Sequence, residues 1–146
     1  MPIEESEKKR RLALLEAHFN AENDHDLDRI METFASETEM IYNRQSFRDH
    51  SSIAQGHSYI GFAGQGAFAE LKTLRDHVHY TEDEVVVEGR LIGKHIGEFQ
   101  GFAPTGREVE LPYVTFYRFD RSGKLVSERV VMNLGTLAHT PGWRPQ

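Results

Sequence analysis

The run REVELPYVTFYRF, residues 107–119, decides the fold of this chain. Apolar or aromatic side chains, with one threonine, recur at every second position: Val109, Leu111, Tyr113, Thr115, Tyr117 and Phe119. Side chains two residues apart share one face of a strand, so this spacing predicts a long strand with one face toward a core. Val114 and Phe116 fall on the opposite face, which is therefore also partly apolar.

The same period of two extends to both sides of this run. It predicts further strands at residues 77–81, 84–94, 96–102 and 124–133. Pro104-Thr-Gly106 and Arg121-Ser-Gly123 carry residues that favour tight turns between successive strands. The second half of the chain is therefore predicted to form a meandering, mostly antiparallel sheet.

The first half of the chain has helical spacing instead. Apolar residues three and four apart predict a helix over residues 4–20, and Asn23 or Asp24 is the predicted cap of a second helix that runs to Phe34. Residues 39–42, which end in Tyr42, are predicted to form a short strand. We expect a loop over 43–57 and a third helix over 58–75, with three glycines in its first half.

Helices first and strands second predict a single α+β domain over residues 1–146. We expect three N-terminal helices to pack into a curved, mostly antiparallel sheet built from residues after 76. The helices cannot fill the whole concave face, so this arrangement encloses a pocket. A short helical piece is expected near 134–139, with Pro141-Gly142 as its stop.

Composition excludes several classes of protein. The net charge is -6, and the one basic cluster, at residues 8–11, lies beside acidic residues, so no nucleic-acid partner is expected. The chain has no cysteine, which removes disulfides and thiolate metal sites. No apolar run approaches the roughly 18 residues of a membrane span, and the charged N-terminus is unlike a secretory signal. We therefore expect a soluble, cytoplasmic protein.

Two segments carry a resemblance to a known family. The first is GKHIGEFQGFAPTGR at residues 93–107, and the second combines Gly123-Lys124-Leu125, Glu128-Arg129 and Gly135-Thr-Leu137. Together they resemble the SnoaL-like polyketide cyclases of the nuclear transport factor two-like superfamily. The order of helices and strands extends the resemblance over most of the chain.

The resemblance implies a cone-shaped α+β barrel that is commonly dimeric and needs no metal or organic cofactor. The family's cyclases close polyketide rings by an intramolecular aldol reaction, with an acid–base group in the pocket. Alignment on Gly123-Lys124 puts the family's acid–base Asp on Val130, or on Arg129 with a slip of one residue. It puts the pocket His on Thr115 and a nearby Gln on Tyr113. The resemblance therefore carries over the architecture but not the catalytic pair.

Candidate site residues follow from strand faces. Tyr113, Thr115 and Tyr117 share the inward face and suit the orientation of a carbonyl or enolate oxygen, although buried tyrosines also serve simply as core. Glu128 shares its face with Val130. A carboxylate desolvated in the pocket has a raised pKa and can act as a general base. The alternative for Glu128 is an ion pair at the strand edge.

Histidines supply the other candidates. His79 is a second acid–base candidate, because an unperturbed imidazole titrates near pH 6.5. His77 and His79 together could hold a metal, but the rest of a cupin-like pattern is missing, so no metal is expected. His95 belongs to the family-like segment and suits substrate binding or a structural hydrogen bond. Asn133 and Tyr42 complete the candidate binding residues, since an amide or phenol can bind but not readily transfer a proton.

Two functions fit these features best. One is a cofactor-free enzyme that acts on a small carbonyl compound by proton transfer and enolate stabilisation, as in cyclisation, isomerisation or dehydration. The other is a non-catalytic module for small-molecule binding or dimerisation. A metal-dependent, cupin-like enzyme is a third. In either of the first two cases we expect a homodimer, because Val114 and Phe116 leave an apolar outer face to cover.

Overall fold

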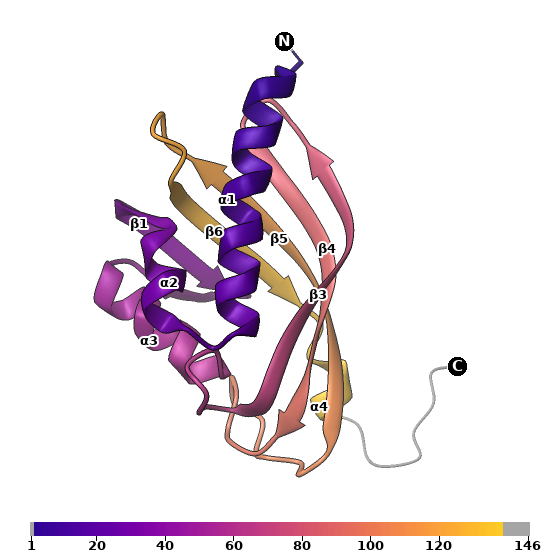
Figure 1. The fold of residues 1–146 in the computed structure, drawn as a ribbon. Coiled ribbons are helices and arrows are strands. Elements are labelled where there is room, and N and C mark those ends of the chain that lie inside the picture. The colour runs from indigo at the N-terminus through magenta and orange to yellow at the C-terminus, as the bar shows by residue number, and fades with distance from the viewer. Residues whose placement is uncertain (1, 139–146) are drawn as a thin grey trace.

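The computed structural model describes residues 2–138, and helices lie over one face of a curved sheet (Figure 1). Helix α1, Glu5–Asn23, starts with Glu5 and Glu7, whose charges suit the positive end of the helix dipole. Its buried face carries Leu15, His18, Phe19, Ala21 and Glu22. The predicted first helix is confirmed, and its buried face contains two ionisable side chains.

Helix α2, Leu27–Glu32, begins after Asp26, whose carboxylate accepts a hydrogen bond from the Arg29 amide at 3.2 Å. The predicted cap at Asn23 or Asp24 is wrong by two or three residues, because Asn23 ends α1 and Asp24 is its C-terminal cap. The cap at Asp26 satisfies one of the free amides of the first turn.

The third helix lies earlier in the chain than predicted. Helix α3, His50–Ile60, is capped by Asp49, which accepts from the Ser52 amide at 2.8 Å. Gly61, with φ of 136°, follows the helix in a conformation that other residues rarely adopt. The expected loop over 43–57 is therefore partly helical, and the glycines end the helix rather than weaken its start.

Strand β3, Phe68–Tyr80, occupies much of the predicted third helix. Its pairing with the next strand shifts between residues 69 and 72 and again between 75 and 77. These two bulges interrupt the period of two, and across the first of them Phe68 and Leu71 are both buried at a helical spacing of three although they lie in a strand. The sequence pattern was misleading here because the strand is irregular.

The other strands are β1 (Phe34–Tyr42), β2 (Gln45–Phe47), β4 (Glu84–His95), β5 (Glu108–Phe119) and β6 (Leu125–Met132). They form one sheet with β3 in the order β2-β1-β6-β5-β4-β3. Only the β1–β6 pairing is parallel among these strands. The α+β, mostly antiparallel prediction is confirmed, but the sheet is open, and strands before residue 76 also contribute to it.

Two C-terminal predictions differ in detail. Residues 96–102 were expected to form a strand, but they make a turn with a single bridge between Phe99 and Phe102. Gly101, at φ of 90°, permits that turn. Helix α4, Gly135–Ala138, agrees with the expected helical piece, while its expected stop at Pro141-Gly142 lies outside the described residues. Within residues 2–138, no helix combines the length and apolar character of a membrane span.

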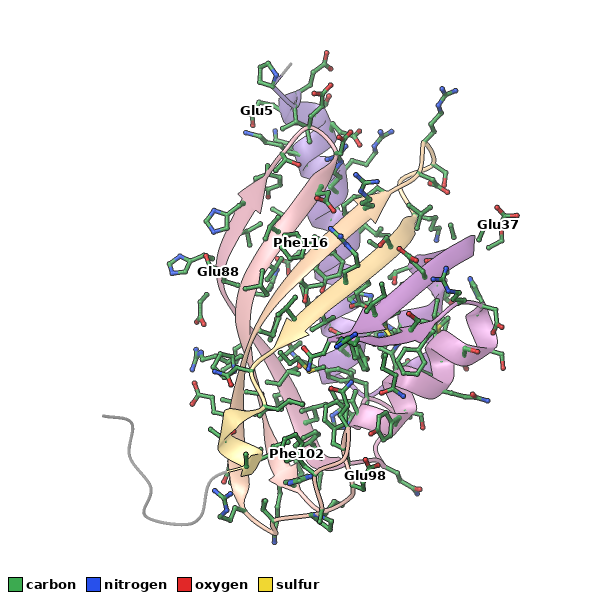
Figure 2. All side chains as sticks on the ribbon, turned by 180° about the vertical axis from the view of Figure 1, so that it is seen from behind. Glu5, Glu37, Glu88, Glu98, Phe102 and Phe116 are labelled. Carbon is green, nitrogen blue, oxygen red and sulfur yellow. The ribbon has the colours of Figure 1, made fainter. Side chains whose placement is uncertain are left out.

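The core lies between the concave face of the sheet and helices α1–α3. Strand β5 alternates as predicted: Leu111, Tyr113, Thr115 and Tyr117 are buried, whereas Phe116 lies on the face away from α1 (Figure 2). Strand β6 turns Glu128, Val130 and Met132 inward. These two strands therefore bring polar groups into an otherwise apolar core.

Candidate active site

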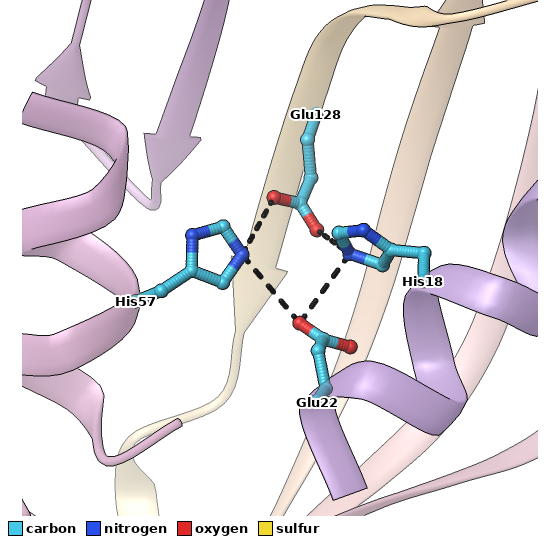
Figure 3. Close-up of side chains that lie close together, drawn as sticks. All are labelled: His18, Glu22, His57 and Glu128. Atoms are coloured by element: carbon cyan, nitrogen blue, oxygen red, sulfur yellow. Dashed lines mark hydrogen bonds and ion pairs between the residues drawn. The ribbon is translucent and has the colours of Figure 1, made fainter. Parts of the chain in front are cut away.

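Four ionisable side chains meet where α1, α3 and β6 converge (Figure 3). His18 and Glu22 are four residues apart on α1 and share one face of that helix. His57 comes from α3 and Glu128 from β6. All four are almost fully buried, with exposed fractions of 0%, 4%, 0% and 3% in chain order. Buried ionisable groups are rare unless paired, so this His–Glu cluster is the candidate site.

Each imidazole directs its Nε2 at both carboxylates. His18 Nε2 lies 3.1 Å from Glu128 Oε1 and 3.4 Å from Glu22 Oε2. His57 Nε2 lies 3.6 Å from Glu22 Oε2 and 3.6 Å from Glu128 Oε2. Glu22 thus reaches both histidines through one oxygen, whereas Glu128 uses a different oxygen for each.

Hydrogen bonds on the far side fix the tautomer of both rings. The Thr33 hydroxyl lies 2.6 Å from the Ile30 carbonyl and donates to it, so Thr33 Oγ1 accepts from His18 Nδ1 at 2.9 Å. His57 Nδ1 lies 2.9 Å from the Ile53 carbonyl, which can only accept. Both Nδ1 atoms therefore carry hydrogen. Each Nε2 faces the carboxylates with either a lone pair or a second proton.

Electrostatics within the cluster oppose the effect of burial. Desolvation alone would lower the pKa of His18, but the carboxylates of Glu22 and Glu128 outweigh it and raise this pKa to about 10. Burial would raise the pKa of Glu22, but the neighbouring imidazoles hold it below its usual value. Burial raises the pKa of the Tyr42 and Tyr117 phenols, which therefore stay protonated as hydrogen-bond donors.

A narrow pocket lies beside the cluster, with a cavity volume of about 20 Å³, which is room for about one water molecule. Glu22 and Glu128 form part of its wall, together with Tyr42, Tyr113 and Tyr117. Most of the remaining lining is apolar: Phe19, Ile60, Phe62, Leu91, Val130 and Met132. Its lining, apolar with a few convergent polar groups, has the chemical character of a small-molecule site, and the walls must move apart to admit a molecule larger than water.

Five of the predicted site residues line this pocket: Tyr42, Tyr113, Thr115, Tyr117 and Glu128. The Tyr113 hydroxyl lies 2.7 Å from Thr73 Oγ1, and the Tyr117 ring packs edge-on to His18 with ring centroids 5.9 Å apart. Val130 and Thr115, to which the resemblance assigns the family's acid–base groups, line the same pocket. The carboxylates that line the pocket of this chain, Glu22 and Glu128, thus stand at other sequence positions than those to which the resemblance assigns the family's acid–base groups.

His79 is not in the pocket. Its side chain is 56% exposed and pairs with Glu88 at 2.7 Å. The bulge between residues 75 and 77 shifts the alternation of β3, so Val78 and Tyr80 pack toward the core and His77 and His79 point outward. The prediction of a pocket position for His79 is therefore wrong.

His95 and Asn133 also lie away from the pocket. His95 is buried against Phe68, with ring centroids 5.0 Å apart, and its Nδ1 accepts from the Thr105 amide at 3.2 Å. Asn133 is exposed beyond the end of β6 and accepts from the Gly135 amide at 2.8 Å. Both lie outside this pocket and make local hydrogen bonds, which for His95 was one of the two predicted roles.

Three members of the cluster were not predicted: His18, Glu22 and His57. The available signal for the first two was a His and a Glu four residues apart beside Phe19, on the apolar face of the first helix. His57 falls at the end of the loop expected over residues 43–57, because the third helix was placed too late in the chain. Only the tertiary structure brings these residues to Glu128.

An open α+β cone, with helices over the concave face of one sheet and a pocket between them, defines the nuclear transport factor two-like class. More particularly, the chain belongs to the SnoaL-like polyketide cyclase family, whose model matches residues 12–139. The comparison with functionally curated proteins found no match.

Solved structures with this fold span several described activities. A proposed SnoaL-like polyketide cyclase from Jannaschia sp. CCS1 is 22% identical, with a TM-score of 0.76 over 94% of each chain. AclR, a proposed hydroxylase from Streptomyces galilaeus, is 25% identical, with a TM-score of 0.70 over 92% of this chain and 84% of AclR. The epoxide hydrolase/cyclase-like enzyme SalBIII is 17% identical, with a TM-score of 0.72 over 88% of this chain and 94% of SalBIII.

Proposed function

We propose that this chain is a cyclase-type enzyme that acts on a small carbonyl compound by acid–base chemistry through an enolate. One observation carries the proposal: two buried carboxylates, Glu22 and Glu128, line an apolar pocket and are held against two imidazoles. Proton abstraction beside a carbonyl needs a desolvated base and hydrogen-bond donors for the oxygen that becomes negative. The pocket wall offers both kinds of group within one cluster.

In the proposed reaction, a carboxylate oxygen takes the proton from the carbon next to the carbonyl. The C–H electron pair forms the new C=C bond, and the carbonyl π pair moves onto oxygen. The enolate carbon then attacks a second carbonyl of the same molecule, which closes a ring, and the resulting alkoxide takes a proton back. The sequence consumes no co-reactant, and isomerisation or dehydration would share its first step.

The wall assigns roles to individual groups. Glu128 is the proposed base, and Glu22 is its partner carboxylate, because both reach the pocket and the histidines. The Tyr117 and Tyr42 hydroxyls, which burial keeps protonated, are the proposed donors to the enolate oxygen. Thr115, where the family's pocket His would lie, has no group for proton transfer at neutral pH.

The similar structures support the coarse assignment. SalBIII is described as having a role in pyran ring formation in the polyether salinomycin, and AclR as a proposed hydroxylase. Because one fold hosts several reactions, ring closure by this chain rests on its own buried carboxylates rather than on fold likeness.

The test is hydrogen–deuterium exchange of the acidic C–H of small ketones and 1,3-dicarbonyl compounds in D₂O, followed by NMR. We expect the wild-type protein to accelerate exchange for some members of the panel, and Glu128→Gln to lower that rate by at least about a hundredfold. His79→Ala is the matched control and should leave the rate unchanged, because His79 is exposed outside the pocket. Binding without exchange would instead indicate a non-catalytic binding module.

A further inference from the structure

We propose that His18, Glu22, His57 and Glu128 together bind one divalent transition-metal ion. Each residue offers one ligand atom, and all four atoms lie within 4.8 Å of one another. The inference goes beyond the reaction proposed above and does not rest on it. It concerns what the cluster itself can hold.

The spacing of the atoms fits a four-coordinate ion. Zinc binds imidazole nitrogen and carboxylate oxygen at about 2.0–2.2 Å, which separates neighbouring ligand atoms in a tetrahedron by roughly 3.3–3.5 Å. The Nε2–carboxylate distances in the cluster are 3.1, 3.4, 3.6 and 3.6 Å. Glu128 uses a different oxygen toward each histidine, so these distances involve five atoms; with one atom from each residue, every pair lies within 4.8 Å, and a bound ion would draw the more distant pairs together.

Both histidines are already oriented as metal ligands. Hydrogen bonds to Thr33 and to the Ile53 carbonyl keep hydrogen on each Nδ1 and turn each Nε2 toward the cluster, where a metal ion would displace any proton on it. A metal-binding His almost always donates its other ring N–H to a carbonyl or a similar acceptor, which fixes the ring and strengthens the bond to the metal. His18 on α1 and His57 on α3 both donate their Nδ1–H in this way and direct Nε2 into the same cluster.

Two atoms in the cluster lack a hydrogen-bond partner. His57 Nε2 and Glu128 Oε2 are fully buried, and neither has a hydrogen bond within residues 2–138. Leaving a buried polar group unsatisfied costs about 1–3 kcal/mol, so such atoms call for a specific explanation. They lie 3.6 Å apart and both point into the cluster, where one ion would bind both (Figure 3).

The charges also balance. In the metal-bound form both imidazoles are neutral, because each Nε2 gives its lone pair to the ion, so the two carboxylates and one divalent ion sum to zero. Burial of net charge is costly, so a neutral sum favours the bound state. The N₂O₂ donor set suits zinc, iron, cobalt or nickel better than calcium or magnesium, which prefer oxygen ligands. The sequence led us to expect no metal, both from the incomplete cupin-like pattern at His77 and His79 and from the family resemblance; the site proposed here departs from that expectation and uses different residues.

The ion would lie at the pocket wall, because Glu22 and Glu128 both line the pocket. Glu22 faces the histidines through Oε2 alone, so its Oε1 stays outside the coordination sphere, whereas Glu128, the base proposed above, would be bound to the ion (Figure 3). In the metal-bound protein the free oxygen of Glu22, rather than Glu128, would be the group that takes the proton, since four protein ligands leave no open position on a four-coordinate ion.

The test uses tag-free, full-length protein that is stripped with a chelator and titrated with ZnCl₂ by calorimetry. Metal content is then measured by elemental analysis. We expect one zinc per chain, and four-coordinate visible absorption when cobalt replaces it. Glu128→Gln and His57→Gln should weaken zinc binding by at least about a hundredfold, whereas His79→Ala should bind like wild type. Thr33→Val keeps all four ligands and should weaken binding by about tenfold to a hundredfold.

Two results would overturn the metal site: wild-type protein that binds no zinc or cobalt, or cluster variants that bind zinc like wild type. Circular dichroism identifies variants that fail to fold. If the variants are lost in this way, the number of zinc ions bound per wild-type chain still tests the metal site. A metal-free protein with Glu128-dependent proton exchange would remove the metal site and leave the proposed function. One ion per chain without exchange would retain the metal site and remove the proposed function.

Discussion

His18 Nε2 lies 3.1 Å from Glu128 Oε1, and this contact joins helix α1 to strand β6 across 110 residues of sequence. Both side chains are withdrawn from water, with exposed fractions of 0% and 3%. Each group therefore depends on the cluster, rather than on solvent, to compensate its charge or its lone pairs. Removal of one side chain from the cluster should therefore change the charge compensation and hydrogen bonding of the other three.

Removal of one partner should be strongly destabilising. His18→Ala leaves the carboxylates of Glu22 and Glu128 buried without one imidazole, and we expect unfolding to become easier by about 3–5 kcal/mol. The control is His79→Ala, which breaks the exposed pair with Glu88 and should change stability by no more than about 1 kcal/mol. Urea unfolding measures both. Equal losses in the free energy of unfolding for His18→Ala and His79→Ala would argue against an energetically coupled cluster.

Thr33 should act through His18. Thr33→Val keeps the shape of the side chain but removes the oxygen that accepts from His18 Nδ1. We expect a loss of about 1–3 kcal/mol, because a buried N–H is left unsatisfied. Thr33→Ser retains the oxygen and should lose much less. A stable Thr33→Val protein with wild-type behaviour would mean that this hydrogen bond does not hold the ring.

Gly89 should resist substitution. A Cβ atom at this position of β4 would meet the Leu74 carbonyl and the Tyr113 hydroxyl. Overpacking of this kind typically costs about 1–3 kcal/mol, so Gly89→Ala should lower the urea midpoint and displace the Tyr113 ring in the pocket. Gly93→Ala, on the same strand, has its nearest neighbours at 3.1 Å and should be milder. Equal midpoints for the two variants would contradict this packing.

We propose that the outer sheet face forms a homodimer. Val131 is 57% exposed there and pairs across the strands with Val114. Sedimentation should give a dimer for the wild type at tens of micromolar protein, and Val131→Lys should shift it to monomer, because a charge is costly to bury. Ile96→Lys, at another exposed apolar residue, should stay dimeric. A wild-type monomer would end this proposal.

Much of the fold could be predicted from the sequence because three strands and one helix are regular. Strands β4, β5 and β6 agree with the predicted ranges to within one residue at each end. Helix α3 and strand β3 were mispredicted. The bulges of β3 and the glycines after α3 gave that stretch a mixed periodicity, which local spacing cannot resolve.

The site could be predicted only in part. Glu128 and the tyrosines were found because strand faces follow a period of two, which needs no knowledge of tertiary contacts. His18, Glu22 and His57 became site residues only when α1 and α3 packed onto β6. No local pattern links residues that far apart in the chain. His79 was assigned to the wrong face because a bulge between residues 75 and 77 reverses the alternation.

The central claim is that the two carboxylates of the His–Glu cluster act as one reactive unit. The most direct measurement is the deuterium-exchange rate of a carbonyl compound with wild type, Glu22→Gln, Glu128→Gln and the double variant. When two residues act together in one step, the rate losses caused by their separate substitutions do not add in the double variant. We predict that each single variant loses at least about a hundredfold in rate and that the double variant loses little more. Unchanged exchange in the double variant would contradict the account.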